Sequence, residues 1–569
     1  MERNVTIRTV LKSSLAGADR GVRSALSRLR LSTQGRLPAA LWIPVAAATA
    51  YLFTLAFNVR ELLEGHYHWR PDFVWAPLLA RDLAETGGGG LINVGDTPHY
   101  STIWFLVLTE GLPFSRQLWE VAPFLITLCG LALMAWSAHK VAGSWAGFMT
   151  MAIGVAGGPA IFATTLTEGM RSHTWFAVGA TSAFLIFLAT RPESLKARAL
   201  VGISVLAGTF TGITLASDPL FAVCGLAPLL GTATLGWLIY RTSRIRDLAI
   251  VAWATSVLGI GLSVIIENRM QAAGYRKTLL PDYSFVTLDQ FLGALKALVT
   301  DILTLTNGNF FGQRVGLLSL ATLGIAVLSV VALSLPFFLL KPRLRHARTE
   351  HGREPWMLYV IFWTLAMLAT AAAYLLSPIP TAFGQSLTTR YLVPVFYGIA
   401  AIVPVWAAEA GWRKILTAGA TTVLCMVSLL NLRSHLAEVQ LPIQPQAAKI
   451  AAFLDDQGLE RGYASYRIAH TFTYSNEKEQ RAYPVYNCEY PEADICPFYV
   501  NTRTTWYEPQ VGAETFLIAD PPDYLSLTVP AVDIFGEPKQ SREFGGFTVL
   551  VYDYDIASRF SSAGPPGAD

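Results

Sequence analysis

The sequence has few charged residues. Asp, Glu, Lys and Arg make up 15% of its 569 residues, whereas hydrophobic residues make up 53%, and the mean hydropathy is +0.41. Soluble globular chains carry roughly 25% charged residues. This composition therefore excludes a water-soluble multidomain protein and predicts an α-helical polytopic membrane protein.

Several motifs are also missing. The chain has no phosphate-binding P-loop and no paired CxxC motifs. It shows no internal repeat, so the sequence gives no support to a transporter built from repeated halves. The basic N-terminal stretch also lacks the order of a cleavable signal peptide. We therefore expect the first apolar segment to be retained as a membrane span.

Long apolar runs dominate what is present. A bilayer core needs about 20 apolar residues for each helical span, and such runs predict about eleven transmembrane helices. The expected spans are 38–57, 121–139, 141–162, 173–190, 199–217, 219–240, 248–266, 316–340, 356–377, 391–408 and 415–432.

Lys and Arg set the expected orientation, because basic loops stay on the cytoplasmic side. A basic tail, residues 1–37, precedes the membrane domain, 38–432. Starting from a cytoplasmic tail, alternation places the basic loops 191–198, 241–246, 341–353 and 412–414 inside. The long loops 59–118 and 267–315 and the C-terminal region 433–569 then lie outside, in a cell or plasma membrane.

The C-terminal region 433–569 has no lipid-length apolar run and predicts a soluble α/β domain. A helix is expected over 445–458, and strands over 515–520 and 546–555. Cys488 and Cys496 lie outside on this topology, where thiols oxidise, so we expect a disulfide. The other three cysteines fall within spans and are interpreted as buried apolar residues.

Four motifs occur in the order seen in a known family. They are "PDFVWAPLLARDLAETG" after the first span, "DTPHYSTIWFLVL" at 96–108, "TEGMRSHTWFAV" at 167–178 and "TTRYLVPVF" at 388–396. The set resembles GT-C membrane glycosyltransferases of the protein mannosyltransferase and aminoarabinose transferase type. This resemblance implies a sugar donor linked to polyprenyl phosphate and an inverting transfer. The family's first loop often carries adjacent acidic residues, whereas here Phe73 follows Asp72.

Asp72 is the predicted catalytic base, because glycosyl transfer needs a group that takes the proton of the acceptor hydroxyl. An N-cap of the helix expected over 73–86 is the structural alternative. Arg171 and Arg390 are predicted to hold the phosphate. Their alternatives are an ion pair of Arg171 with Glu168 and an interfacial position for Arg390.

The remaining candidates for substrate binding are Glu168, His173, His99 and Asp218. For Asp218, followed by Pro219, the favoured interpretation is a turn between two helices, with a site role second. His66, His68 and His99 allow a divalent metal site, but solvated or hydrogen-bonded histidines are the favoured interpretation and no cofactor is firmly implied.

The predicted function is glycosyl transfer to a hydroxyl of a lipid, protein or cell-envelope glycan outside the cytoplasm, with no nucleic-acid partner. Nucleotide sugars are not expected as donors, since the proposed site faces outward and lacks a DxD motif. An amphipathic helix over 288–303 is expected either on the outer leaflet or against the C-terminal domain. A transporter or lipid flippase, and a non-catalytic glycolipid-binding protein, remain the rival functions.

Overall fold

The computed structural model describes most of the chain. The described residues are 43–54 apart from 45 and 53, 71–86, 90–112 apart from 96, 115–157, 161, 165, 171–191, 197–277, 285–346, 353–378, 380, 388–438, 444–476, 480–488, 494–519 and 528–560.

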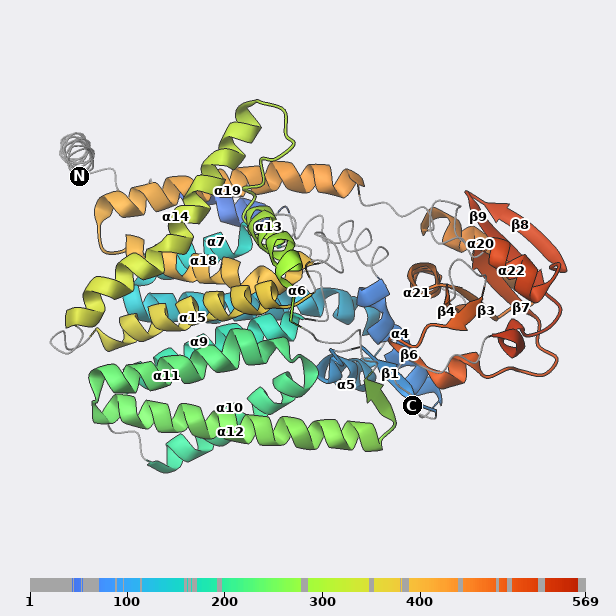
Figure 1. Ribbon diagram of the computed structural model, residues 1–569, viewed down its shortest axis with the longest axis horizontal. Coiled ribbons are helices and arrows are strands. Elements are labelled where there is room, and N and C mark those ends of the chain that lie inside the picture. Colours follow the sequence, from blue (N-terminus) through green and yellow to red (C-terminus); the bar gives the residue numbers. More distant parts are fainter. Residues whose placement is uncertain are drawn as a thin grey trace.

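Helices make up the first three quarters of the molecule (Figure 1). They are α4 (Pro71–Thr86), α5 (Tyr100–Thr109), α6 (Ser115–Ala142), α7 (Ser144–Val155), α9 (Ser172–Thr190), α10 (Ala197–Ser217), the π-helical turn η2 (Ala222–Leu226), α11 (Ala227–Tyr240), α12 (Ser243–Ala272), α13 (Leu288–Leu305), α14 (Leu317–His346), α15 (Glu354–Leu376), the 3-10 turn η3 (Thr389–Leu392), α18 (Val393–Ala407) and α19 (Gly411–Glu438).

Nine helices in the described part of the chain are long and apolar enough to cross a membrane. They correspond to nine of the eleven expected spans, and the two segments that flank Asp218 are separate helices, α10 and α11. Of the expected span 38–57, only part of 43–54 is described. In 141–162 the structure has the 12-residue helix α7. The chain is thus a multi-pass helical membrane protein, and the count of eleven spans stays a prediction.

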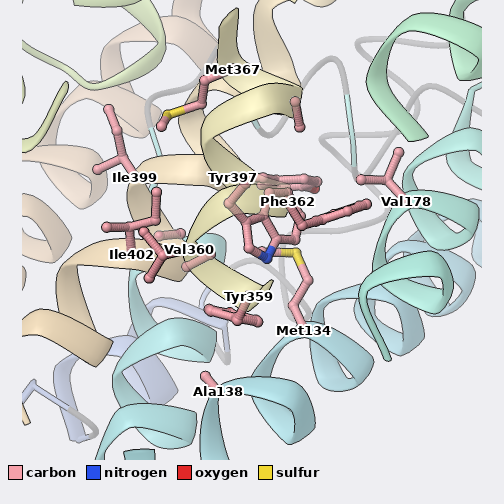
Figure 2. Close-up of a cluster of buried hydrophobic side chains, with 14 of the residues drawn as sticks. Met134, Ala138, Val178, Tyr359, Val360, Phe362, Met367, Tyr397, Ile399 and Ile402 are labelled. Carbon is pink, nitrogen blue, oxygen red and sulfur yellow. The ribbon is translucent and has the colours of Figure 1, made fainter. Parts of the chain in front are cut away.

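Aromatic and sulfur-containing side chains fill the centre of the bundle. Phe362, Met134 and Tyr397 come from α15, α6 and α18 and pack together without exposure to solvent (Figure 2). Helices α6 and α9 approach closely at Gly130 and Gly179, where a Cβ on Gly179 would lie 2.3 Å from the Gly130 carbonyl oxygen. Small residues allow such close contacts between membrane helices. This crossing fixes the position of α9, which begins directly after Arg171.

Three segments far apart in the sequence form one small sheet at one end of the bundle. Strand β1 (Ile92–Val94) pairs in parallel with β2 (Tyr275–Lys277) and antiparallel with β6 (Thr502–Arg503). These strands belong to the loop 59–118, the loop 267–315 and the C-terminal region. Both long loops and the C-terminal domain therefore lie at the same end of the bundle, as Figure 1 shows.

The C-terminal domain has a six-stranded mixed sheet in the order β5-β4-β3-β7-β9-β8. Three α-helices and two 3-10 turns accompany the strands. The bounds are α20 (Gln444–Asp456), β3 (Arg461–Ser465), α21 (Tyr466–Ser475), β4 (Arg481–Asn487), β5 (Ile495–Pro497), η4 (Thr504–Tyr507), β7 (Thr515–Ala519), α22 (Thr528–Phe535), β8 (Gln540–Phe544), β9 (Phe547–Tyr552) and η5 (Ile556–Arg559). The α/β fold expected for this region is present, including its helix near 445–458 and both expected strands.

Successive side chains of a strand point to opposite faces of the sheet. In this sheet, both faces pack against a hydrophobic core. In β7, Phe516 and Ile518 face the core formed with α20 and α21. Leu517 and Ala519 face the opposite side and belong to the same core as Val74 and Trp75 of α4. Helix α4 of the first long loop therefore forms part of the core of the C-terminal domain.

Buried charges reinforce this contact. Asp82 of α4 forms an ion pair with Arg503 of β6, and both side chains are buried. The Trp506 indole N–H also donates to the Asp82 carboxylate, at 3.2 Å. Arg481 of β4 pairs with Glu85 one turn further along α4. Three groups of the C-terminal domain thus hold one face of α4.

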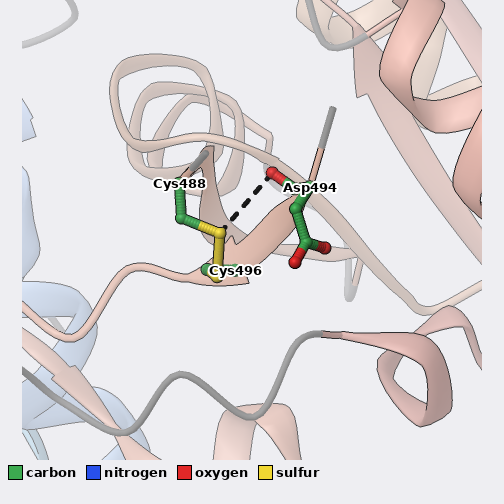
Figure 3. Close-up of a disulfide and its surroundings, with 3 residues drawn as sticks. All are labelled: Cys488, Asp494 and Cys496. Atoms are coloured by element: carbon green, nitrogen blue, oxygen red, sulfur yellow. Dashed lines mark hydrogen bonds between the residues drawn. A yellow bond between two sulfur atoms is a disulfide. The ribbon is translucent and has the colours of Figure 1, made fainter. Parts of the chain in front are cut away.

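The predicted disulfide between Cys488 and Cys496 is present and connects the residue after β4 to β5 (Figure 3). Asp494 lies beside it, and its carbonyl oxygen accepts the Cys488 backbone N–H at 3.0 Å. The two sulfur atoms are bonded to each other and so are not available as thiolate ligands. The disulfide closes the short loop at this edge of the sheet.

Candidate functional site

Several helix ends meet at the end of the bundle that faces the C-terminal domain. Helix α10 ends at Ser217, while α5, α9 and η3 begin at Tyr100, Ser172 and Thr389. The N-termini of helices carry partial positive charge and favour anions. Three helix N-termini and one helix C-terminus therefore lie at the same end of the bundle as the charged and polar side chains described below.

Arg171 and Asp218 form a buried ion pair at this point. Arg171 Nη1 lies 3.2 and 3.1 Å from the two carboxylate oxygens of Asp218. Its Nη2 donates to the Thr97 hydroxyl at 3.3 Å, and the Thr174 hydroxyl donates to Asp218 at 2.7 Å. Breaking such a pair is costly, since the remaining charge is buried without compensation. The recorded partner of Arg171 is thus Asp218, which lies 47 residues away in the sequence.

Asp218 also forms the turn that its sequence predicts. The Leu220 backbone N–H donates to its side chain at 3.0 Å, and the Phe221 N–H donates to its carbonyl oxygen at 3.1 Å. Burial acts to raise the pKa of Asp218, but Arg171, the two nearby histidines and the Thr174 hydrogen bond together outweigh it, and the pKa is lowered. The turn role and the position beside Arg171 therefore coexist, and Asp218 is an ionised carboxylate at neutral pH.

His99 is held beside this pair by the backbone. It adopts a left-handed conformation, with φ 50° and ψ 37°, which is uncommon for a residue other than glycine. Its N–H donates to the Ser217 carbonyl oxygen at 2.9 Å, next to Asp218. Burial lowers the pKa of His99 well below its ordinary value; Asp218 opposes this shift and Arg171 adds to it. The imidazole is therefore neutral near pH 7.

The His99 ring lies 6.2 Å from that of His173, in an edge-to-face arrangement. His173 is also 3.3 Å from the Thr174 hydroxyl. Among the described residues, the buried Nδ1 of His99 has no hydrogen-bond partner. The two histidines are thus adjacent to the Arg171–Asp218 pair.

Arg390 reaches the same region from η3. Its guanidinium carbon lies 5.4 Å from the centre of the Tyr391 ring, and that of Arg171 lies 5.0 Å from the same ring. Cations within about 6 Å of an aromatic face are attracted by it. Tyr391, which directly follows Arg390, therefore brings the two predicted phosphate-binding arginines together.

A second buried carboxylate, which the sequence analysis missed, lies next to the 3-10 turn η3. Asp301 of α13 accepts hydrogen bonds from the hydroxyls of Tyr374 and Thr388, at 2.6 and 2.8 Å. Burial raises the pKa of Asp301, although both hydrogen bonds act in the opposite direction. Asp301 shares a helical face with the buried residues Ala294 and Leu298, a spacing that could have identified it.

An apolar groove runs along the spanning helices. Its cavity volume is about 120 Å³, and it lies between α14, α18 and α19. Phe396, Ile399, Val403 and Trp406 line one wall, spaced along a single face of α18. Thr306, which directly follows α13, lines it as well. The groove thus follows α18, the helix that begins three residues after Arg390.

The structure places the remaining predicted residues as follows. Asp72 lies in the first turn of α4, which begins at Pro71 and not after Asp72, and its side chain lies outside the described residues. Glu168, His66 and His68 also lie outside them. Of the seven predicted catalytic and substrate-binding residues, the structure brings together Arg171, Arg390, His173, His99 and Asp218.

Comparisons with known proteins give matches among solved structures alone. No protein-family model and no curated protein matches the chain. ArnT from Cupriavidus metallidurans in the apo state has 14% sequence identity and a TM-score of 0.44, over 90% of this chain and 99% of that one. The same protein bound to undecaprenyl phosphate has 14% identity and a TM-score of 0.47, over 88% and 98%.

An oligosaccharyltransferase of Archaeoglobus fulgidus, in complex with zinc and sulfate, also matches. It has 10% identity and a TM-score of 0.41, over 73% of this chain and 58% of that one. ArnT is an aminoarabinose transferase of the GT-C type, the family that the sequence motifs resemble. At these TM-scores and identities, the likeness assigns neither an activity nor a ligand to this chain.

Proposed function

We propose that the protein is a membrane glycosyltransferase that moves a sugar from a polyprenyl-phosphate donor to a hydroxyl group of a lipid, protein or cell-envelope glycan. The observation that carries the proposal is the placement of Arg171 and Arg390 on one aromatic ring, beside a buried carboxylate. The motifs that resemble GT-C enzymes supply several of these residues.

Arg390 is the proposed contact for the donor phosphate. A guanidinium group stays protonated and offers a planar set of donors that suits phosphate oxygens. Arg171 is buried, and its two terminal nitrogens are already engaged by Asp218 and Thr97. Arg171 therefore supports the site through its charge and through Asp218, while the half-buried Arg390 is placed to contact the ligand.

Asp72 remains the proposed base. Asp218 is a poor candidate, because an ionised carboxylate held by Arg171 and by the Thr174 hydroxyl has little tendency to take a proton. Asp72 lies in the first turn of α4. The neutral His99 would contribute a hydrogen bond from its buried Nδ1 to a sugar hydroxyl.

The proposed reaction is one displacement. The acceptor oxygen forms a bond to the anomeric carbon while the bond between that carbon and the phosphate oxygen breaks. Polyprenyl phosphate leaves with the electron pair of the broken bond, and the acceptor proton passes to Asp72. A single attack from the opposite face inverts the anomeric centre.

The apolar groove supports a lipid-linked donor. Its walls are mainly aliphatic, and it runs along α18 from Phe396, six residues after Arg390, to Trp406. A hydrocarbon chain in this groove would place its headgroup at the end where Arg390 lies. Because basic loops favour the cytoplasmic side, we propose that this end faces outward.

The test is a transfer assay in proteoliposomes with several radiolabelled polyprenyl-phosphate sugars and a membrane extract as the source of acceptors. We expect Asp72→Asn to lower the transfer rate by about 10²-fold or more, as loss of a general base does. Arg390→Gln is expected to raise the KM for the donor. Asp289→Asn, at an exposed position on α13, is the matched control and should transfer at the wild-type rate.

Two results would contradict the proposal. Full activity of Asp72→Asn would remove Asp72 as the base, since Asn still caps a helix well. A folded wild-type protein that transfers none of the sugars, although it binds the polyprenyl phosphates, would exclude the glycosyltransferase and leave a non-catalytic lipid-binding protein.

A further inference from the structure

Helix α13 has three chemically different faces. Successive residues project about 100° apart around a helix. Ala294, Ala297, Leu298, Asp301 and Leu305 form a face that is buried in the protein. Asp289 and Lys296 lie on another face, which is exposed, and the half-buried Thr300 lies on the same side. The third face lies between these two and is apolar.

This apolar face, here called the α13 stripe, consists of Leu288, Leu292, Leu295 and Val299. Their exposed fractions are 86%, 71%, 40% and 49%. The spacing of four, three and four residues keeps all four side chains in one narrow strip. Phe285, just before the helix, is also exposed. Exposure of this strip of large apolar side chains to water would be unfavourable.

The inner face fixes where the helix lies. Asp301 accepts hydrogen bonds from Tyr374, near the end of α15, and from Thr388, just before η3. Both partners lie at the end of the bundle that faces the C-terminal domain. Figure 1 shows α13 crossing the spanning helices instead of running alongside them. The helix axis therefore lies across the bundle, at the level where the spanning helices end.

The neighbouring surface is also apolar. Val315 and Leu317, at the start of the spanning helix α14, are exposed, as are further aliphatic residues along that helix. The helix that follows α13 in the chain thus exposes apolar side chains along a segment long enough to cross a membrane. A helix with one apolar and one charged exposed face is typical of the boundary between lipid and water.

We propose that α13 is an interfacial helix whose stripe of Leu288, Leu292, Leu295 and Val299 is inserted among the lipid acyl chains of the leaflet on the side of the C-terminal domain. Asp289 then faces the water, and Asp301 faces the protein. This inference concerns a lipid-binding surface and holds whether or not the protein transfers sugars.

The test uses the full chain in vesicles, with a single environment-sensitive fluorophore on an introduced cysteine. Leu295→Cys samples the stripe, and Asp289→Cys samples the charged face, about 120° away around the helix. The background carries Cys129→Ser, because Cys129 is the exposed free cysteine among the described residues. Vesicles contain either ordinary or brominated phosphatidylcholine, and iodide serves as the quencher from the water.

We expect brominated lipid to quench the fluorophore at Leu295→Cys at least twofold more than at Asp289→Cys, and iodide to show the reverse order. Leu292→Cys repeats the measurement at a second stripe position, which covers the case in which one variant fails to fold. Iodide quenching of both stripe positions as strong as that at Asp289→Cys would overturn the proposal. Protection from both quenchers would overturn it as well, because protein would then cover the stripe.

Discussion

Two buried aspartates at the same end of the bundle are held in different ways. Asp218 accepts from a guanidinium group and from the Thr174 hydroxyl. Asp301 is equally buried, but its recorded partners are the hydroxyls of Tyr374 and Thr388. The pKa of Asp218 is lowered and the pKa of Asp301 is raised.

The difference shows that burial by itself does not set the charge of a carboxyl group. Burial raises the pKa of both residues, and the outcome depends on whether a fixed positive charge lies within contact distance. Asp218 therefore contributes a permanent negative charge beside Arg171. Asp301 instead accepts hydrogen bonds from neutral hydroxyls and ties α13 to the segment just before Arg390.

Removing the charge of Asp218 should have the largest effect. In Asp218→Asn, the buried Arg171 loses its counter-ion, so we expect the free energy of unfolding to fall by about 3–5 kcal/mol. Unfolding in mixed detergent micelles measures this change. In an Arg171→Gln background the same substitution should cost much less. An equal cost in both backgrounds would show that the pair does not stabilise the protein.

The hydroxyl partners give a smaller and more direct comparison. Thr174→Val removes a hydrogen bond to a carboxylate whose charge Arg171 stabilises, which is worth about 1.5–3 kcal/mol. Thr388→Val should cost less, because Asp301 lacks such a cation and its pKa is raised. Both substitutions keep the side-chain shape. The same unfolding assay compares them, and a larger loss for Thr388→Val would reverse the assignment of charges.

A fall in pH should change the stability contributions of Asp218 and Asp301 in opposite directions. The folded pKa of Asp218 is lowered, so its contribution to stability is present above its ordinary pKa near 4 and is lost as the pH falls through the folded value. The folded pKa of Asp301 is raised, so its contribution is present below pH 4 and is lost as the pH rises through the folded value. Each proton changes the free energy of unfolding by at most about 1.4 kcal/mol per pH unit.

Unfolding of the two Asn variants between pH 3 and 7 measures this. The stability difference between the wild type and Asp218→Asn should shrink as the pH falls. As the pH falls, the wild type should become more stable relative to Asp301→Asn. Parallel curves for wild type and both variants would mean that neither carboxyl titrates differently in the folded protein.

Much of the fold could be predicted because lipid-length apolar runs are a strong local signal. Nine expected spans have a matching helix, and the α/β character of the C-terminal domain and its disulfide were also predicted. The sheet β2-β1-β6 was not predicted. Its strands have two or three residues each and come from three distant segments, so no local pattern indicates them.

Sequence analysis named five residues that the structure brings together, but not their pairings, and it missed Asp301. The ion pair considered as an alternative role for Arg171 was with the nearby Glu168, which lies outside the described residues, whereas Arg171 pairs with Asp218. Sequence analysis favours partners that are close along the chain. The meeting of α9 and α10 depends on how the helices pack, and one sequence does not show that. The same limit hid Asp82, whose partner Arg503 is 421 residues away.

Asp301→Asn should have the smallest effect on stability at neutral pH, with a change of less than about 1 kcal/mol. Asn keeps the oxygen that accepts from Tyr374 and Thr388, and because these partners are neutral hydroxyls, the substitution leaves no buried cation without its counter-ion. The measurement is the unfolding assay at pH 7, with Asp301→Leu as the partner variant that removes the acceptor. We expect Asp301→Leu to lose more stability than Asp301→Asn, because the two buried hydroxyls then lack their acceptor. A loss of several kcal/mol in Asp301→Asn would mean that a positive charge holds this carboxylate, which would make the two aspartates equivalent.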